Sequence, residues 1–417
     1  MPFRIALSGL NAASTDLKVT GNNIANSATT GFKGSRAEFA DVYASSFGGV
    51  TDTATGNGVQ VANVAQQFSQ GSIDFTEKAL DLSISGQGFF TLQDDSGQMY
   101  SRAGNFHVAA NGNVVNNINQ RLQVFPVVGN TTPASFNTGV LSDLQLATTD
   151  GPPAATTDVV AGLNLNAANT APATAVFDPT DPTSYNSSTS VVVYDSLGAQ
   201  HTSSMYFVKT ATPNQWENYL YVDGNNITPT TATPAIPTPI TMTFDGSGTL
   251  QPPTQVSYAQ IPSNMLATGA DPLTLSFDYS NTTQFGGSFS VNQLSQNGFS
   301  SGRLSGIDVG DEGVVFARFT NGQSSALGKV AMANFANPQG LRKLGDTNWA
   351  ETFDSGTLTL GEPGTGSLGL LQSGALEASN VDIATELVNL ITAQRNYQAN
   401  AQVISAADTI TQTIINI

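Results

Sequence analysis

The two ends of the chain show the spacing of amphipathic helices. Near the start, large apolar residues recur every seven positions, and near the end their spacing alternates between four and three. Such spacing places apolar side chains on one face of a helix, so we predict one helix at each terminus. Gly31 is expected to end the first helix. The predicted seam residues are Phe3, Leu10, Leu17 and Ile24 in the first helix, and Ile383, Leu387, Leu390, Ile391, Tyr397 and Ile404 in the second.

Between the two ends, the apolar pattern changes to a period of two. Leu273, Leu275, Phe277 and Tyr279 alternate with polar residues, which is typical of a half-buried strand. Asn-Gly and Asp-Gly pairs separate such runs, and these residues tolerate the positive φ angles of tight hairpin turns. From about residue 71 to 362 we therefore predict a mainly antiparallel β structure.

The middle of this β region has its own composition. Of the 19 prolines, 16 fall between Pro126 and Pro272. Residues 122–302 also contain eleven acids and a single base, Lys209. Both features revert on the C-terminal side, so we interpret the middle as a domain inserted into another domain.

The resulting division of the chain has four discontinuous parts. The seams of the terminal helices have no obvious partner within the chain, because polar, Gly-rich segments at Gly48–Gly58 and Gly356–Gly369 separate them from the nearest clear strands. The predicted parts are a terminal helical assembly domain of residues 1–32 with 370–417, a linker segment of 33–70 with 363–369, a β domain of 71–145 with 286–362, and an inserted outer β domain of 146–285.

The composition excludes several classes of partner. Only 11% of the residues are charged, and the net charge is −17, so the chain lacks the bases needed for a patch that binds nucleic acid or anionic lipid. No apolar run is long enough to span a membrane, and none resembles a cleaved secretory signal. We expect no nucleic-acid partner and no membrane insertion.

A search for catalytic or metal-binding chemistry finds no convincing site. There is no cysteine, and the only histidines, His107 and His201, fall in strand-like stretches where surface or half-buried positions are expected. The adjacent acids Asp94-Asp95 and Asp311-Glu312 stand in apparent turns beside Gly. We predict no catalytic, cofactor-binding or metal-binding residues and no enzyme activity. A glycosidase pair of carboxylates drawn from distant positions stays open.

Three segments carry a specific resemblance. They are Asn22–Gly34 (NNIANSATTGFKG), Leu80–Phe90 with Tyr100–Phe106 (LDLSISGQGFF and YSRAGNF), and Glu377–Asn400, which contains ELVNLITAQRNYQAN. Together they cover about a third of the chain and resemble the bacterial flagellar rod and hook family, in the family's order. Asn119 stands where the family commonly has Gly, and Asn can adopt the same left-handed backbone.

The resemblance implies a structural axial protein rather than an enzyme. Its fold would be mainly β, with discontinuous antiparallel domains, one inserted in the other, and terminal helices that pair as a coiled coil in the assembled filament. Its long β insert is similar to that of the hook subunits, which form a flexible helical tube that transmits motor torque from rod to filament.

The resemblance also implies partners and a location. The partners would be further copies of the chain, the flagellar rod and hook–filament junction proteins, the hook cap during assembly, and the type III export apparatus. The protein would lie outside the cell in the hook of the flagellar basal body, exported without a cleaved signal peptide. Two alternatives stay open, namely a distal rod protein of the same family and an extracellular carbohydrate-binding β protein.

Overall fold

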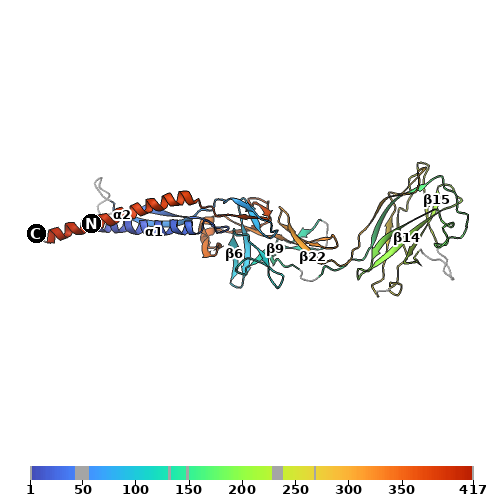
Figure 1. Cartoon of the computed structure of the whole chain (residues 1–417), viewed down its shortest axis with the longest axis horizontal. Helices are drawn as coiled ribbons and strands as arrows, with labels where there is room; N and C mark the ends of the chain where they lie inside the picture. The colour runs from blue at the N-terminus through green and yellow to red at the C-terminus, as the bar shows by residue number, and fades with distance from the viewer. Residues whose placement is uncertain are drawn as a thin grey trace. The chain divides into compact units, whose positions relative to one another are not determined.

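The computed structural model describes residues 2–42, 56–129, 133–146, 150–227, 238–266 and 269–415. The chain is mainly β with one helix at each end, as predicted (Figure 1). It divides into two compact units. Unit 1 consists of Met1–Thr148, Gly306–Arg318 and Ser324–Ile417, and unit 2 consists of Thr149–Ser305 and Phe319–Gln323.

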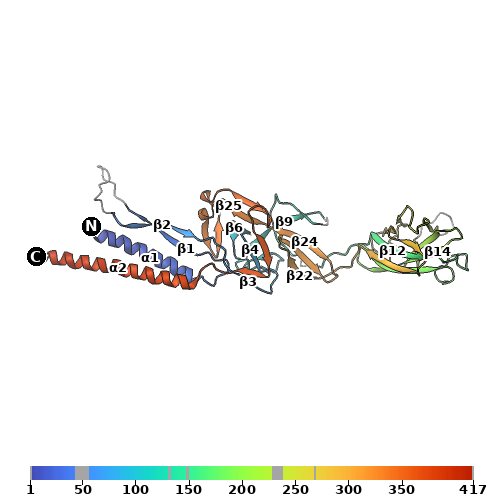
Figure 2. The same ribbon diagram turned by 90° about the horizontal axis from the view of Figure 1, so that it is seen from above.

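The two terminal helices lie side by side within unit 1. They are α1 (Pro2–Ala25) and α2 (Ile383–Ile415), drawn in blue and red in Figures 1 and 2. Gly9 of α1 lies so close to α2 that an added Cβ would be 2.5 Å from Oδ1 of Asn400. The expectation that the seams have no partner within the chain is therefore wrong, because each helix partly covers the other. Helix α1 also ends at Ala25, before Gly31.

A two-stranded hairpin occupies the segment predicted to be a linker. Strands β1 (Ser35–Asp41) and β2 (Val59–Gln66) pair in antiparallel fashion and pack beside α1 (Figure 2). Asn23 of α1 holds the hairpin through Ser35, since its Nδ2 donates to Ser35 O at 2.7 Å and its Oδ1 accepts from Ser35 N at 2.9 Å. The linker prediction was wrong here because most of the hairpin is exposed and its apolar alternation is weak. Most of the Gly48–Gly58 segment lies outside the described residues.

The body of unit 1 is built on one large sheet. Its main path runs β22-β23-β24-β9-β5-β6-β27-β26, and β4 pairs with β29 and β3 with β30 in separate two-stranded sheets. The core contains Leu82, Phe90, Leu122 and Val330. The elements are β3 (Ile73–Phe75), β4 (Leu82–Ser85), β5 (Phe89–Asp94), β6 (Gly97–Ser101), β7 (His107–Val108), β8 (Val114–Val115), β9 (Arg121–Val128), β10 (Ser135–Phe136), β11 (Ser142–Asp143), β22 (Leu304–Val309), β23 (Val314–Phe319), β24 (Ser324–Val330), β25 (Met332–Phe335), η1 (Pro338–Gly340), β26 (Arg342–Gly345), β27 (Asn348–Ala350), η2 (Phe353–Ser355), β28 (Leu358–Gly361), β29 (Leu370–Ser373) and β30 (Ala375–Glu377).

Unit 2 contains two five-stranded sheets around a shared core. One has the order β18-β19-β12-β20 with β21 on β12, and the other has the order β13-β14-β15-β16 with β17 on β15. Side chains of both sheets, among them Leu163, Phe207 and Trp216, form one buried cluster. The strands are β12 (Asp158–Asn166), β13 (Ser187–Tyr194), β14 (Gln200–Lys209), β15 (Gln215–Val222), β16 (Asn225–Asn226), β17 (Ile240–Thr243), β18 (Gln255–Ser257), β19 (Ser276–Asp278), β20 (Thr283–Phe285) and β21 (Ser290–Gln296).

The pairing of β12 departs from the antiparallel expectation. It is parallel to β19 and β20 and antiparallel to β21. Turn signals in a sequence report only hairpin neighbours, so pairing between strands this far apart along the chain leaves no local trace. Because β21 belongs to unit 2, this unit continues to Ser305, past the predicted end of the inserted domain at residue 285.

The chain enters and leaves unit 2 along adjacent backbones. Gly151 pairs with Gly302, and Ala154 pairs with Phe299, in two isolated antiparallel bridges. Gly151 N donates to Gly302 O at 2.8 Å. The ends of the inserted segment therefore lie side by side, as expected for an insertion.

The predictions about three single residues have different outcomes. Asn119 has a φ of 64°, so it adopts the left-handed backbone that was expected where the family commonly has Gly. His107 lies on β7 and is exposed, also as expected. His201 lies on β14 as a strand residue, but it is buried rather than at the surface or half-buried.

His201 is held between two carboxylates. Its Nδ1 lies 2.5 Å from Oδ2 of Asp223, and its Nε2 lies 3.2 Å from Oδ2 of Asp195. Backbone N–H groups fix both acids, since Asp195 Oδ1 accepts from Ala199 N and Asp223 Oδ1 accepts from Thr202 N. Burial lowers the pKa of His201, but the hydrogen bonds and charges of Asp223 and Asp195 outweigh burial and raise the pKa above its ordinary value.

We predict that unit 2 loses stability as the pH rises above neutrality. A raised pKa in the folded state means that His201 adds stability below its unfolded pKa, about 6.5, and that this stability is lost as the pH rises through the folded pKa. Urea unfolding from pH 5.5 to 9, followed through Trp216 in a Trp349→Phe background, measures the change. The His201→Gln variant is the control and should show a flatter profile. A wild-type profile as flat as that of His201→Gln would contradict the prediction.

Candidate functional site

The candidate catalytic residues of the sequence lie in turns. Asp94 ends β5, where its Oδ1 accepts from Ser96 N at 2.6 Å, and Asp95 is fully exposed. Asp311 and Glu312 are exposed in the turn that follows β22. Among the described residues, no group of three or more acids and histidines could hold a metal ion. No helix of the described chain is long and apolar enough to cross a membrane.

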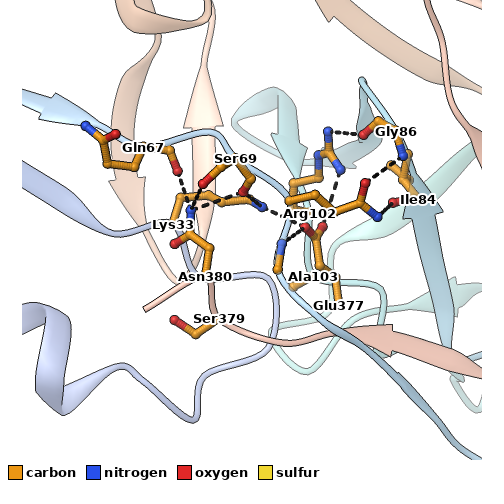
Figure 3. Close-up of polar contacts among 12 residues, drawn as sticks. Lys33, Gln67, Ser69, Ile84, Gly86, Arg102, Ala103, Glu377, Ser379 and Asn380 are labelled. Carbon is orange, nitrogen blue, oxygen red and sulfur yellow. Dashed lines mark hydrogen bonds and ion pairs between the residues drawn. The ribbon is translucent and has the colours of Figure 1, made fainter. Parts of the chain in front are cut away.

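The most constrained polar site lies where the two helices join the β body. Lys33 follows α1, Glu377 ends β30 just before α2, and Arg102 follows β6 (Figure 3). Lys33 Nζ donates to Glu377 Oε1 at 2.7 Å, and Arg102 Nη1 donates to Glu377 Oε2 at 3.3 Å. The side chains of Lys33 and Glu377 are 1% and 0% exposed. One carboxylate thus joins three distant parts of the chain, and we call Lys33, Arg102 and Glu377 the junction triad.

Backbone groups complete the surroundings of Glu377. Its Oε1 also accepts from Gly71 N at 2.9 Å, and its main-chain O accepts from Gly31 N at 2.8 Å. Lys33 Nζ makes a further hydrogen bond to Ser69 O at 2.8 Å. The buried carboxylate is therefore paired with charges and with N–H donors, which is the condition under which a buried ion is tolerated.

A second set of hydrogen bonds surrounds the junction triad. Asn380 Oδ1 accepts from Gly34 N at 2.8 Å, while its Nδ2 donates to Gln67 O at 2.7 Å and to Ser69 Oγ at 3.0 Å (Figure 3). Arg102 Nη2 donates to Gly86 O at 2.8 Å, beyond the end of β4. Asn380, just before α2, is thereby fastened to the segments that precede β1 and follow β2, and Arg102 is fastened to the segment that follows β4.

The electrostatics of the junction triad suit a structural role. Burial lowers the pKa of Lys33, the carboxylate of Glu377 opposes this change, and the charge of Arg102 reinforces it. Burial also lowers the pKa of Arg102, again opposed by Glu377. Arg102 lies over the ring of Phe89, 5.4 Å from its centroid. Lys33 and Arg102 both pair with the carboxylate of Glu377, so the site fixes the segments next to the helices to the β body.

The structure places the predicted seam residues in two groups. Half-buried positions are occupied by Leu10, Leu17, Ile24, Leu390 and Ile404, and exposed positions by Phe3, Ile383, Leu387, Ile391 and Tyr397. The contact between the helices also uses residues that the sequence analysis missed. Among the α2 residues whose burial is described, Ala393 is the buried one, and Asn400 lies against Gly9. Small residues at a close helix contact carry little hydrophobic signal.

The junction triad was also missed, although a signal was present. Lys33, Arg102 and Glu377 each lie in a different one of the three segments that carry the family resemblance. The structure brings these three segments together at one buried carboxylate.

The chain is similar to known proteins along its whole length. Four family profiles match along the chain, and whole-length relatives are found. The Escherichia coli (strain K12) flagellar hook protein FlgE is 40% identical over 100% of both chains, and FlgE of Borreliella burgdorferi is 32% identical over 99% of this chain and 98% of that protein. The profiles are Flagella basal body rod protein (residues 3–33), Flagellar hook protein FlgE/F/G D1 domain (83–152), Flagellar basal body protein FlaE D2 domain (164–299) and Flagellar basal body rod FlgEFG protein C-terminal (372–417).

These matches define the class and then the family. The chain is an axial structural protein of the bacterial flagellum. It belongs to the flagellar hook protein family, which confirms the interpretation as a hook subunit and sets the rod and carbohydrate-binding alternatives aside. The crystal structure of Helicobacter pylori flagellar hook protein FlgE2 shares the fold, with a TM-score of 0.51 and 16% identity over 73% of this chain and 100% of that chain.

We predict that Glu377→Gln destabilises unit 1 by about 3 to 5 kcal/mol, because it leaves two buried cations without their shared counter-charge. Hydrogen exchange of the β3 and β30 amides in the full chain measures the loss. Glu38→Gln is the matched control, because it breaks the exposed Arg36–Glu38 pair and should cost less than about 1 kcal/mol. Equal effects of the two variants would contradict the assigned role of the junction triad.

We also predict that Gly31→Ala costs more stability than Gly129→Ala. Both glycines have a φ of 68°, so both substitutions carry the strain of a left-handed L-residue, about 1 to 2 kcal/mol. A Cβ at Gly129 would meet nothing within 4 Å, whereas a Cβ at Gly31 would overlap the backbone N of Ala103. Hydrogen exchange of unit 1 compares the two variants. Similar losses of stability in the two variants would contradict the prediction, because they would mean that the backbone near Ala103 moves away from the added Cβ at little cost.

Proposed function

We propose that this chain polymerises through its terminal helices into the tube of the flagellar hook. The observation that carries the proposal is the exposed apolar surface of α2. Seven large apolar side chains of this helix are 38% to 63% exposed, and an interaction with other copies would remove them from water. They are Ile383, Leu387, Val388, Ile391, Tyr397, Val403 and Ile410.

Assembly would cover this surface with neighbouring copies. Each large apolar side chain that becomes buried contributes about 1.5 to 3 kcal/mol before ordering costs. The first turns of α1 also expose apolar side chains that neighbouring copies could cover, namely Phe3, Ile5 and Leu7. In the filament α1 and α2 pair as a coiled coil, and contacts between unlike faces that do not close into a ring produce an open helical polymer.

The predicted domains have distinct roles in this polymer. Residues 1–32 with 370–417 form the assembly domain that surrounds a narrow channel, and the β domains face outward. The tube bends while it transmits torque from rod to filament. The low charge density and the many Thr, Asn and Ser residues of the inserted segment suit small polar contacts that slide during bending.

The proposed location is outside the cell, in the hook of the flagellar basal body. The chain reaches it unfolded through the type III export apparatus, without a cleaved signal peptide. Its other partners are the rod proteins, the hook–filament junction proteins and, during assembly, the hook cap. This role requires no catalysis and no cofactor.

Leu387→Glu and Ile391→Glu are predicted to prevent polymerisation while leaving the monomer folded. Both side chains are exposed in the single chain, so a carboxylate costs little there, but it would be buried between copies at a cost of several kcal/mol. Sedimentation and negative-stain microscopy detect the polymer, and circular dichroism checks the monomer. Gln98→Glu adds the same charge at an exposed polar position of β6, away from the helices, and is expected to disturb assembly less. Normal tubes from both apolar variants would contradict the proposal.

A further inference from the structure

A groove of about 530 Å³ runs between the terminal helices and the β1–β2 hairpin of unit 1. Its walls come from α1, β1, the segment that follows β2 and the first turns of α2. Val19, Phe39 and Val381 supply apolar surface. Its charged lining consists of the acids Asp16, Asp382 and Glu386 and the base Arg36. We call it the acidic groove.

Two of the three acids are free to receive a partner. Asp382 caps α2, where it accepts from Ala384 N at 2.9 Å and from Thr385 Oγ1 at 2.8 Å. Asp16 and Glu386 have no side-chain hydrogen bond or ion pair with any described residue. Arg36, the one basic residue among those lining the groove, does not neutralise these acids, because it pairs with Glu38 at 2.9 Å. Burial raises the pKa of Asp16, because removal from water disfavours the charged carboxylate, and a nearby cation would stabilise that charge.

The complementary charges are on the same helices. Arg4, Lys18 and Arg395 are the bases of α1 and α2, and all three are exposed without an ion pair to any described residue. Arg395 stands one turn after Ile391, which is also exposed, so this face offers a guanidinium beside an apolar side chain. The acidic groove offers the same combination, with carboxylates beside Val19 and Phe39.

Arg395 cannot reach the acidic groove of its own chain. Nine residues separate it from Glu386 on α2, which is about 14 Å along the helix and two and a half turns around it. The two side chains therefore lie on opposite sides of α2. A basic face on one side of the helix can therefore bind an acidic groove on the other side of the next copy. Such a contact between unlike faces can repeat from copy to copy and form an open filament rather than a closed ring.

We propose that the acidic groove receives the face of α2 that carries Arg395 from a second copy of this chain, with Glu386 and Asp16 as its carboxylate partners. The proposal rests on the proposed function, since it names a contact within the polymer. Arginine suits the site because its planar group binds carboxylates in a bidentate manner while its stem packs on apolar surface.

The test uses charge reversal in the full chain, because every copy in the polymer supplies both sides of the contact. Glu386→Arg and Arg395→Glu alone should each raise the concentration needed for polymerisation by on the order of tenfold. The double variant should restore polymerisation to near the wild-type concentration. Glu77→Arg and Lys78→Glu are the matched controls, because they make the same charge changes at exposed residues outside the groove and should have little effect.

Sedimentation measures the polymer, and circular dichroism verifies that each variant keeps its helices. Single reversals without effect, or a double variant no better than the worse single one, would overturn the groove contact while wild-type tubes still support the proposed function. A wild-type chain that stays monomeric at every concentration would overturn both. Varying the salt is less informative, since it also screens the repulsion between chains of net charge −17.

A second measurement does not depend on charge. The chain contains no cysteine, so Glu386→Cys with Arg395→Cys introduces the only two thiols. A short bifunctional thiol reagent should link copies of this variant into a ladder when they are polymerised. Glu77→Cys with Arg395→Cys should give no ladder. A ladder of equal strength from both pairs, or from neither, would overturn the proposed contact.

Discussion

The buried carboxylate of Glu377 is the constraint on which the architecture of unit 1 depends. It accepts hydrogen bonds from Lys33 and Arg102 and from the backbone N–H of Gly71. These donors come from the segment after α1, the β body and the segment after β2. Because α2 begins a few residues after Glu377, the position at which this helix starts is fixed by the same atoms. The segments that lead into and out of the helices are therefore connected to the β body through charge-assisted hydrogen bonds.

The two units use buried charge in opposite senses. In unit 1 a carboxylate lies between two cations, and in unit 2 the ring of His201 lies between two carboxylates. In a chain with only 11% charged residues, both sites hold polar side chains in place through several hydrogen bonds. The surface charges of α1 and α2 form no ion pair with any residue in the described part of the chain.

Most of the fold could be predicted from periodicity, and most of the junction could not. Leu273, Leu275, Phe277 and Tyr279 are all buried, as their alternation predicted, and both terminal helices form where the heptad-like spacing placed them. The β1–β2 hairpin and the parallel partners of β12 left no local pattern. Lys33 and Glu377 are 344 residues apart in sequence, so neither residue alone indicates that they meet in a buried pair. Likewise, the burial of Ala393 depends on a neighbour that hydrophobicity does not reveal.

The bridges at Gly151–Gly302 and Ala154–Phe299 mean that unit 2 begins and ends at one place. A segment with adjacent ends imposes almost no closure cost on the chain that hosts it, whatever its length. Unit 2 is thus exchangeable in principle. Another folded domain with adjacent ends could take its place, while the helices and the junction triad keep their order and connection along the chain.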